Sequence, residues 1–167
     1  MISQSLISSP VGDLIVIADD HALHLLEFAD HRELSKRLAM LENRLGKKIQ
    51  AWENTLIKKV REELSEYFAW KRKHFTVSLA PHGTEFQMKA WKALEQIPYG
   101  ETRSYLEEAT MIGSPKAVRA IGGANHANHF PILIPCHRVI GKSGKLVGYG
   151  GGLARKIWLL DHEKKHK

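Results

Sequence analysis

The only cysteine of the chain, Cys136, lies in the tetrapeptide Pro135-Cys136-His137-Arg138 and could act as a nucleophile. A free thiol has a pKa of about 8.5, so it is mostly protonated near neutral pH, and a neighbouring imidazole or cation raises the thiolate fraction. A lone cysteine is more often an inert packing residue. Because Pro135 favours an extended or turn geometry, we expect it to end an apolar strand at 130–134 and to place the sulfur at the rim of that strand.

Adjacent side chains of a regular strand point in opposite directions, so Cys136 and His137 cannot face each other in one. If His137 activates Cys136, either the backbone is irregular there or a water links the two groups. A nucleophilic triad also needs a third group that orients the imidazole. The nearest acids downstream are Asp161 and Glu163.

Composition narrows the classes of protein. A chain of 167 residues is long enough for one domain or two small ones, and a single cysteine excludes an intramolecular disulfide. The histidines are scattered, so we expect no metal site. We see neither a membrane-length apolar run nor a secretion signal, and we therefore expect a cytoplasmic protein, nucleoid-associated if the source is prokaryotic.

Positive charge is concentrated in the second half of the chain. Residues 1–80 carry 12 Lys and Arg against 11 Asp and Glu, whereas residues 81–167 carry 13 against 7. No acid lies between Glu108 and Asp161. Such a segment favours a polyanionic partner, although a solubilising surface is the alternative, and charge alone does not separate DNA from RNA or an acidic protein.

The first half of the chain predicts an α/β domain over residues 1–80. Apolar runs at 6–7, 14–17 and 23–28, separated by turn residues, predict strands. Leucines at 34, 38, 41 and 45 predict a helix, as do Leu56, Val60, Leu64 and Tyr67. A further short strand is expected at 75–77, and the boundary is expected near 80–83.

The second half, residues 81–167, predicts a mainly helical domain. One helix carries Phe86, Ala90, Trp91 and Leu94, and another spans about 104–110. We expect the next helix to begin with Ser114 as its N-cap and Pro115 at its first position, which makes 105–125 a candidate helix-turn-helix. That pattern alone is weak, because helical hairpins are common.

Two further segments could contact a ligand. Lys116 and Arg119 share one face of the expected helix, and Ala120, Gly122 and Gly123 are small enough to let another molecule approach its backbone. These glycines could instead simply end the helix. A glycine-rich turn at 148–152 precedes a helix at 153–160, and without a Walker-type sequence the default interpretation of this turn is a flexible loop.

The second half of the chain resembles the O6-alkylguanine-DNA alkyltransferases, also called methylated-DNA–protein-cysteine methyltransferases. The resemblance covers residues 84–163 and is specific because the motifs occur in order, whereas the first half matches only in general layout. The motifs are Phe86-Gln87 with Trp91; Ile97-Pro98-Tyr99-Gly100-Glu101-Thr102 with Ser104-Tyr105; Val118-Arg119-Ala120-Ile121-Gly122; Asn128; Ile134-Pro135-Cys136-His137-Arg138-Val139-Ile140-Gly141; and Gly148-Tyr149, Gly152-Leu153, Lys156, Leu159-Leu160 and Glu163.

The resemblance implies a fold and a role for each matching residue. It implies a ribonuclease-H-like N-terminal domain and a C-terminal domain with a helix-turn-helix. Cys136 would accept the alkyl group irreversibly, His137 would act as base through a water, and Glu163 would hold the imidazole. Asn128 would order the active-site segment, and Tyr105 would assist the leaving purine and help to rotate the nucleotide. The remaining residues implied to bind DNA or the base are Arg119, Lys116, Ala120, Gly122, Gly123, Arg138, Val139, Tyr149, Gly150 and Lys156.

The partner implied by the resemblance is duplex DNA that carries an alkylated base, bound through its minor groove. The target is O6-alkylguanine or O4-alkylthymine, and the base must be flipped out of the stack to reach the thiol. We expect no cofactor, no membrane association and a monomer, with cooperative binding along DNA left open. His129 follows Asn128 where the family usually has proline, which predicts a less rigid loop.

Three alternatives have distinct signatures. A binding-only lesion sensor of the alkyltransferase-like class would lack the acceptor cysteine. A thiol hydrolase that uses Cys136, His137 and Glu163 would turn over many substrates and would not need a basic helix-turn-helix. A transcription factor would leave these three residues unexplained.

Overall fold

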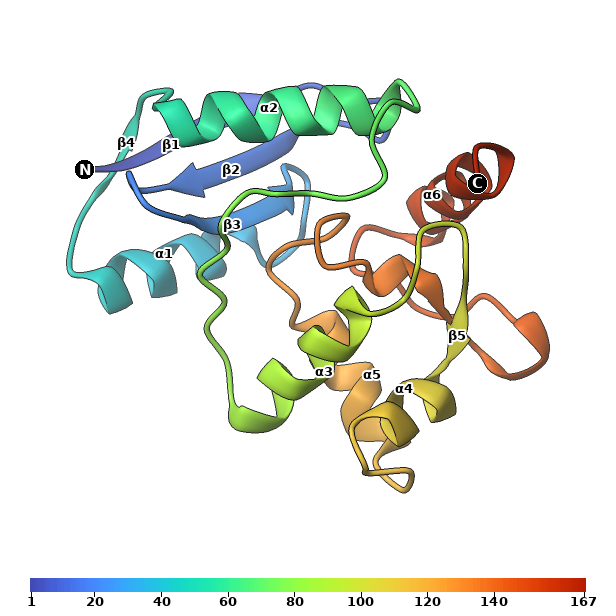
Figure 1. Ribbon diagram of the computed structural model, residues 1–167. Helices are drawn as coiled ribbons and strands as arrows, with labels where there is room; N and C mark the ends of the chain where they lie inside the picture. The colour runs from blue at the N-terminus through green and yellow to red at the C-terminus, as the bar shows by residue number, and fades with distance from the viewer. The chain divides into compact units, whose positions relative to one another are not determined.

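The computed structural model describes residues 1–167, which form two compact units, Met1–Pro81 and His82–Lys167 (Figure 1). None of its helices combines the length and the apolar character that crossing a bilayer requires.

The N-terminal unit is built on a four-stranded sheet. Its strands are β1 (Ile2–Ile7), β2 (Leu14–Ala18), β3 (Leu23–Phe28) and β4 (Ile49–Ala51). They lie in the order β3-β2-β1-β4, with β1 antiparallel to β2, β2 antiparallel to β3, and β1 parallel to β4. The three strands expected from the apolar runs are thereby confirmed.

Two helices cover the two faces of this sheet. Helix α1 (Leu34–Leu45) and helix α2 (Thr55–Phe68) lie on opposite sides of it (Figure 1). The leucine face of α1 packs against alternating sheet residues such as Ile15, Ile17 and Leu25. Both helices were expected from their apolar spacing, because a helix buries side chains that recur every three or four residues.

Two expectations for this unit differ from the structure. Residues 75–77 form no strand, and the chain there makes only an isolated parallel bridge between Leu23 and Leu79. Strand β4 was not expected, because it has three residues and is specified by long-range pairing with β1 rather than by its own sequence pattern.

The C-terminal unit is mainly helical. Its elements are α3 (Glu85–Glu95), β5 (Arg103–Ser104), α4 (Tyr105–Met111), α5 (Val118–His126), the 3-10 turn η1 (Cys136–Arg138), β6 (Val139–Ile140), the 3-10 turn η2 (Lys142–Gly144) and α6 (Leu153–Lys165). Strands β5 and β6 pair in parallel, with Arg103 opposite Val139 and Ser104 opposite Ile140. This short pairing places the start of α4 beside the turn that contains the cysteine.

Small residues let α3, α4 and α5 pack closely. Ala90, Ala109, Ile121 and Ala124 form one buried cluster, and Trp91 Nε1 donates a hydrogen bond to the carbonyl oxygen of Ala124 at 2.8 Å. Capping boxes fix the first turns of α3 and α4, each worth about 1 kcal/mol. The cap of α4 is Ser104, directly after β5, so Tyr105 is the first residue of that helix.

The start of α5 differs from the expectation. Ser114 and Pro115 do not cap or begin the helix, which starts at Val118 with no side-chain cap. They form a turn instead, in which the Ala117 amide donates to the Ser114 carbonyl oxygen at 2.9 Å. The connection between α4 and α5 is therefore longer than the capping pattern predicts, but the helix-turn-helix arrangement is present.

Candidate active site

The cysteine lies in a buried turn rather than at the end of a strand. Residues 130–134 form bends and turns, with Ile132 in the left-handed region at φ 76°. Pro135, at φ −81° and ψ 67°, adopts an inverse γ-turn in which the Cys136 amide donates to the Ile134 carbonyl oxygen at 2.8 Å. The expectation of a strand at 130–134 is wrong, because a short apolar run fits a buried turn as well as a strand.

The side chain of Asn128 forms hydrogen bonds with both this turn and the cysteine sulfur. Its Nδ2 donates to the Ile134 carbonyl oxygen at 2.8 Å and to Cys136 Sγ at 3.3 Å, while its Oδ1 accepts from the Phe130 amide at 2.9 Å. The side chain is buried. An N–H directed at sulfur favours the charged thiolate over the neutral thiol, so Asn128 both orders the segment and supports the nucleophile.

His137 and Glu163 form a buried pair. His137 is fully buried, and its Nε2 lies 2.8 Å from Glu163 Oε2. Burial lowers the pKa of His137 below its ordinary value, although Glu163 opposes this. Burial would raise the pKa of Glu163, but the charges and hydrogen bonds of His137 and Arg138 outweigh it and hold that pKa well below its usual range.

The charge states of His137 and Glu163 follow from a third residue, Arg138. Because the guanidinium of Arg138 donates two hydrogen bonds to Glu163, that carboxylate can remain ionised while His137 is neutral. An ionised carboxylate only accepts hydrogen bonds, so the imidazole hydrogen lies on Nε2. The other ring nitrogen, Nδ1, is then an acceptor, and it is buried with no hydrogen-bond partner in the protein.

Arg138 does not lie on a DNA-facing surface, contrary to the sequence-based expectation. It is buried, with Nε and Nη2 donating to the two oxygens of Glu163 at 2.8 and 3.0 Å and Nη1 donating to the Ile97 carbonyl oxygen at 2.7 Å. Its guanidinium lies 5.7 Å from the ring centre of Tyr99. A guanidinium with these partners anchors α6 to η1, which explains why it is not available to phosphates.

Lys156 holds neighbouring backbone segments together by hydrogen bonds and does not line the cavity. Its buried Nζ donates to the carbonyl oxygens of Val139 at 2.6 Å, Val147 at 2.9 Å and Gly148 at 3.3 Å. Burial lowers the pKa of Lys156, and Cys136 opposes this. Lys156 was expected to line the base pocket and Val139 to contribute backbone contacts to it. Neither residue lines the cavity, and Lys156 instead holds the loop that does line it.

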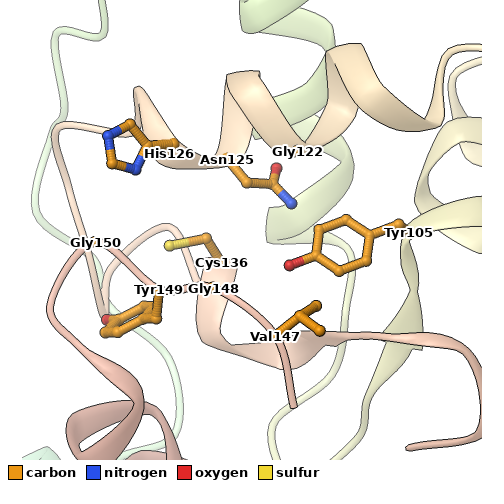
Figure 2. Close-up of a pocket in the computed structure, with 9 residues that line it drawn as sticks. All are labelled: Tyr105, Gly122, Asn125, His126, Cys136, Val147, Gly148, Tyr149 and Gly150. Atoms are coloured by element: carbon orange, nitrogen blue, oxygen red, sulfur yellow. The ribbon is translucent and has the colours of Figure 1, made fainter. Parts of the chain in front are cut away.

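A cavity of about 320 Å³ opens onto the cysteine (Figure 2). Its lining comes from α4, α5, η1 and the loop before α6, and the residues are Tyr105, Gly122, Asn125, His126, Cys136, Val147, Gly148, Tyr149 and Gly150. Ligand sites have volumes upwards of about 300 Å³, so this cavity suits a small planar ligand such as one nucleobase. Tyr149 and Gly150 were expected to line the base pocket, Tyr105 to act on the leaving purine, and Gly122 to contact DNA. Cys136 lies at the wall, as a nucleophile must.

Four lining residues were not expected: Asn125, His126, Val147 and Gly148. Gly148 belongs to a quoted motif, but Asn125 and His126 had no signal beyond their place at the end of a helix. Behind the lining, Glu108 is fully buried, and burial raises its pKa to about 7 against the effect of its hydrogen bond with Asn125. Nothing in the sequence separated Glu108 from its neighbour Glu107, which is a helix-cap residue.

The outer surface of the helix-turn-helix carries positively charged side chains next to very small ones. Lys116, Arg119, Ala120 and Gly123 are exposed. A Cβ atom added to Gly123 would meet no atom within 4 Å, so no internal contact requires a glycine there. A glycine on an open surface leaves room for another molecule to approach the backbone.

His129, which replaces the usual proline, packs edge-to-face against Trp91 with ring centres 6.4 Å apart. No group of three or more His, Cys, Asp or Glu side chains could hold a metal ion.

Comparison with known families matches both units. Residues 2–81 match the ribonuclease-like domain of 6-O-methylguanine DNA methyltransferase, and residues 85–165 match its DNA-binding domain. A methylated-DNA–protein-cysteine methyltransferase of Mycobacterium leprae is 44% identical over 156 residues, which are 93% of this chain and 88% of that protein. The constitutive methyltransferase of Bacillus subtilis is 42% identical and covers 93% of this chain and 92% of its own length.

Solved structures agree with the sequence comparisons. The O6-methylguanine methyltransferase of Mycobacterium tuberculosis superposes with a TM-score of 0.84 at 42% identity, covering all of this chain and 95% of that one. The Mycobacterium tuberculosis OGT in complex with DNA gives a TM-score of 0.85 at 41% identity, covering 98% and 94%. With both domains matched in order and the thiol, imidazole and carboxylate in place, the chain belongs to the 6-O-methylguanine DNA methyltransferase family.

Proposed function

We propose that this protein repairs DNA by moving the alkyl group of an O6-alkylguanine onto its own Cys136, once per molecule. Its relatives are named methylated-DNA–protein-cysteine methyltransferases, and the chain is an enzyme of that kind rather than a binding-only sensor. One observation carries the residue assignment: Cys136 lies at the wall of a nucleobase-sized cavity, and its sulfur accepts a hydrogen bond from Asn128.

His137 is the base in this mechanism. Its Nδ1 takes the thiol proton of Cys136 through a bridging water, which would supply the partner that Nδ1 lacks within the protein. The imidazolium that forms is stabilised by the Glu163 carboxylate at 2.8 Å. Asn128 meanwhile stabilises the sulfur anion by hydrogen bonding.

The thiolate of Cys136 then attacks the alkyl carbon. The new S–C bond forms as the C–O6 bond breaks, and the bonding pair moves into the purine, which takes up a proton and becomes guanine. Burial, together with the charges of Cys136 and Glu108, raises the pKa of Tyr105, so its hydroxyl stays protonated and can donate a hydrogen bond to the leaving purine. The thioether has no easy leaving route, and the protein is consumed by a single reaction.

DNA binding positions the lesion. The chain has a DNA-binding domain, and we propose that α5 enters the minor groove with its small residues against the DNA. Arg119 would then occupy the space left by the flipped base, and Lys116 would contact phosphate, since both side chains are exposed on the acid-free surface. Flipping is required because an O6 substituent within the stack cannot reach a thiol at a cavity wall.

Substitution Cys136→Ala tests this assignment. We expect the variant to lose transfer from an O6-methylguanine duplex completely while its affinity for that duplex stays within about twofold, since the thiol contributes little to phosphate binding. Radiolabelled methyl transfer and fluorescence anisotropy measure the two properties. Transfer by the variant would show that another group accepts the alkyl.

A further inference from the structure

The turn that follows α2 holds a tryptophan in a backbone conformation that suits glycine. Trp70 has φ 62°, in the left-handed region, and it is 55% exposed. At the end of α1 a glycine, Gly46, has the same conformation, with φ 66°. Glycine adopts it at no steric cost, whereas a mostly exposed indole recovers little of that cost by packing. The tryptophan at this place therefore calls for a reason beyond the fold.

The other aromatic side chains of this segment pack inward. Tyr67 is fully buried, and its ring centre lies 5.1 Å from that of Phe68 and 5.4 Å from that of Phe75. Both phenylalanines are partly covered, so Trp70 is the one Phe, Tyr or Trp of residues 67–75 that is exposed. Its indole is presented to solvent rather than to the core.

The tryptophan lies in a second acid-free part of the chain. No Asp or Glu occurs between Glu66 and Glu85, whereas Lys71, Arg72 and Lys73 follow the tryptophan directly. Both lysines are exposed. Exposed cations without acids beside them in the sequence favour an anionic partner.

Arg72 has a different role, because with two glutamates it holds the loop in place. Its Nη1 donates to the His74 carbonyl oxygen at 2.9 Å, and its guanidinium pairs with Glu63 at 3.8 Å and with Glu66 at 3.5 Å. The buried Glu63 also accepts a hydrogen bond from the Thr76 amide at 2.7 Å. Both carboxylates are thereby paired with Arg72. The loop is ordered before any partner binds, which lowers the entropy cost of binding.

An exposed indole followed by lysines fits a strand of unpaired nucleotides. Bases of any sequence stack on an aromatic ring, and cationic side chains bind the phosphates between them. In duplex DNA the bases are stacked inside the helix, so their faces cannot meet an indole. Binding at a membrane surface needs a large apolar face, and here the residues next to the indole are Ala69 and Lys71. The DNA-binding domain of the same chain also favours DNA as the partner.

We propose that residues 70–74 form a second DNA contact, specific for single strands, in which the Trp70 indole stacks on an unpaired base and Lys71 and Lys73 bind the adjoining phosphates. This contact belongs to the N-terminal unit and is separate from the helix-turn-helix. It goes beyond the proposed function, because it holds the protein on single-stranded DNA whether or not a lesion is present.

Binding of a labelled oligothymidylate, measured by fluorescence anisotropy, tests the contact. Trp70→Gly removes the indole and suits the backbone conformation, so this variant should unfold at a urea concentration no lower than the wild type does. We expect its affinity for the single strand to fall about tenfold. Trp52→Ala, at a tryptophan of the same unit that is 63% exposed, is the matched control and should change the affinity less than about twofold.

Paired lysine variants test the phosphate contacts. Lys71→Ala/Lys73→Ala should lower the slope of log affinity against log salt by about 1.4, because each phosphate contact with a single strand contributes about 0.7. The matched control is Lys58→Ala/Lys59→Ala, at two exposed lysines of α2, which should leave the slope unchanged.

Methyl transfer from an O6-methylguanine duplex should stay within about twofold in all these variants, as expected for two separate contacts. Wild-type affinity of Trp70→Gly for the single strand would overturn the inference. A fall in transfer as large as the fall in single-strand affinity would also overturn it, because the loop would then belong to the duplex-binding surface. So would a tryptophan signal that requires Trp70 and responds to phosphatidylglycerol vesicles but not to the oligothymidylate, because the loop would then bind membranes.

Discussion

Replacing the buried carboxyl group of Glu108 should stabilise the protein, and more so as the pH rises. The pKa of Glu108 is raised from 4.5 to about 7 in the folded protein. Between these values the folded state holds a proton that the unfolded state has lost, so the wild type loses stability as the pH increases through this window. Below 4.5 both states are protonated, and the group has no effect.

The magnitude follows from the same two values. A tenfold change in proton affinity is worth about 1.4 kcal/mol, so ionising this group in the folded protein costs about 3 kcal/mol above pH 7. The variant Glu108→Gln keeps the size and hydrogen-bonding capacity of the side chain but does not titrate. We therefore expect its stability advantage over the wild type to widen by about 2 to 3 kcal/mol between pH 5 and pH 8.

Urea unfolding at a series of pH values measures this difference. The buried Trp91 of the same unit provides a fluorescence signal for it. The contributions of His137 and Glu163 also depend on pH, but they are present in both proteins and cancel when the two curves are subtracted. A difference between variant and wild type that stays constant from pH 5 to pH 8 would refute the reasoning, because it would mean that Glu108 ionises with an ordinary pKa.

Two further substitutions test the residues around the thiol and on the DNA-facing helix. Asn128→Ala removes three hydrogen bonds from the cysteine turn, and we expect single-turnover transfer to slow by about 10- to 100-fold, worth about 1.4 to 2.7 kcal/mol, with lesion affinity nearly unchanged; an unaltered rate would remove Asn128 from the mechanism. Arg119→Ala should weaken binding to undamaged and damaged duplexes, and if Arg119 also neutralises a phosphate it should lower the slope of log affinity against log salt by about 1. A wild-type salt slope together with wild-type affinity would show that Arg119 does not face DNA.

The sequence predicted the elements that have strong apolar periodicity. Helices α1 and α2 followed from their apolar spacing, whereas the one cap that was predicted, Ser114 with Pro115, does not begin α5. The failures have a common physical cause, which is that long-range contacts decide them. Strand β4 exists only through its pairing with β1, and the 130–134 run became a turn held by Asn128.

In the active site, too, local motifs were predicted from the sequence, whereas features that depend on long-range contacts were not. The order of motifs pointed to Cys136, His137 and Glu163, and the structure brings the imidazole and carboxylate to 2.8 Å. Arg138 was misassigned because adjacency in sequence does not reveal that its guanidinium turns inward to Glu163. Asn125 was not predicted because its hydrogen-bond partner, Glu108, lies 17 positions away, and no local pattern marks a buried pair of this kind.

The central claim is a stoichiometric transfer to one sulfur, and intact-mass measurement tests it most directly. The protein is incubated with increasing amounts of a short duplex that contains one O6-methylguanine, and the mass of the whole chain is recorded at each ratio. We predict a gain of one methyl group per chain that saturates at one equivalent and maps to Cys136 by peptide analysis. Continued loss of methyl from the DNA beyond one equivalent, or a methyl group on any other residue, would contradict the account.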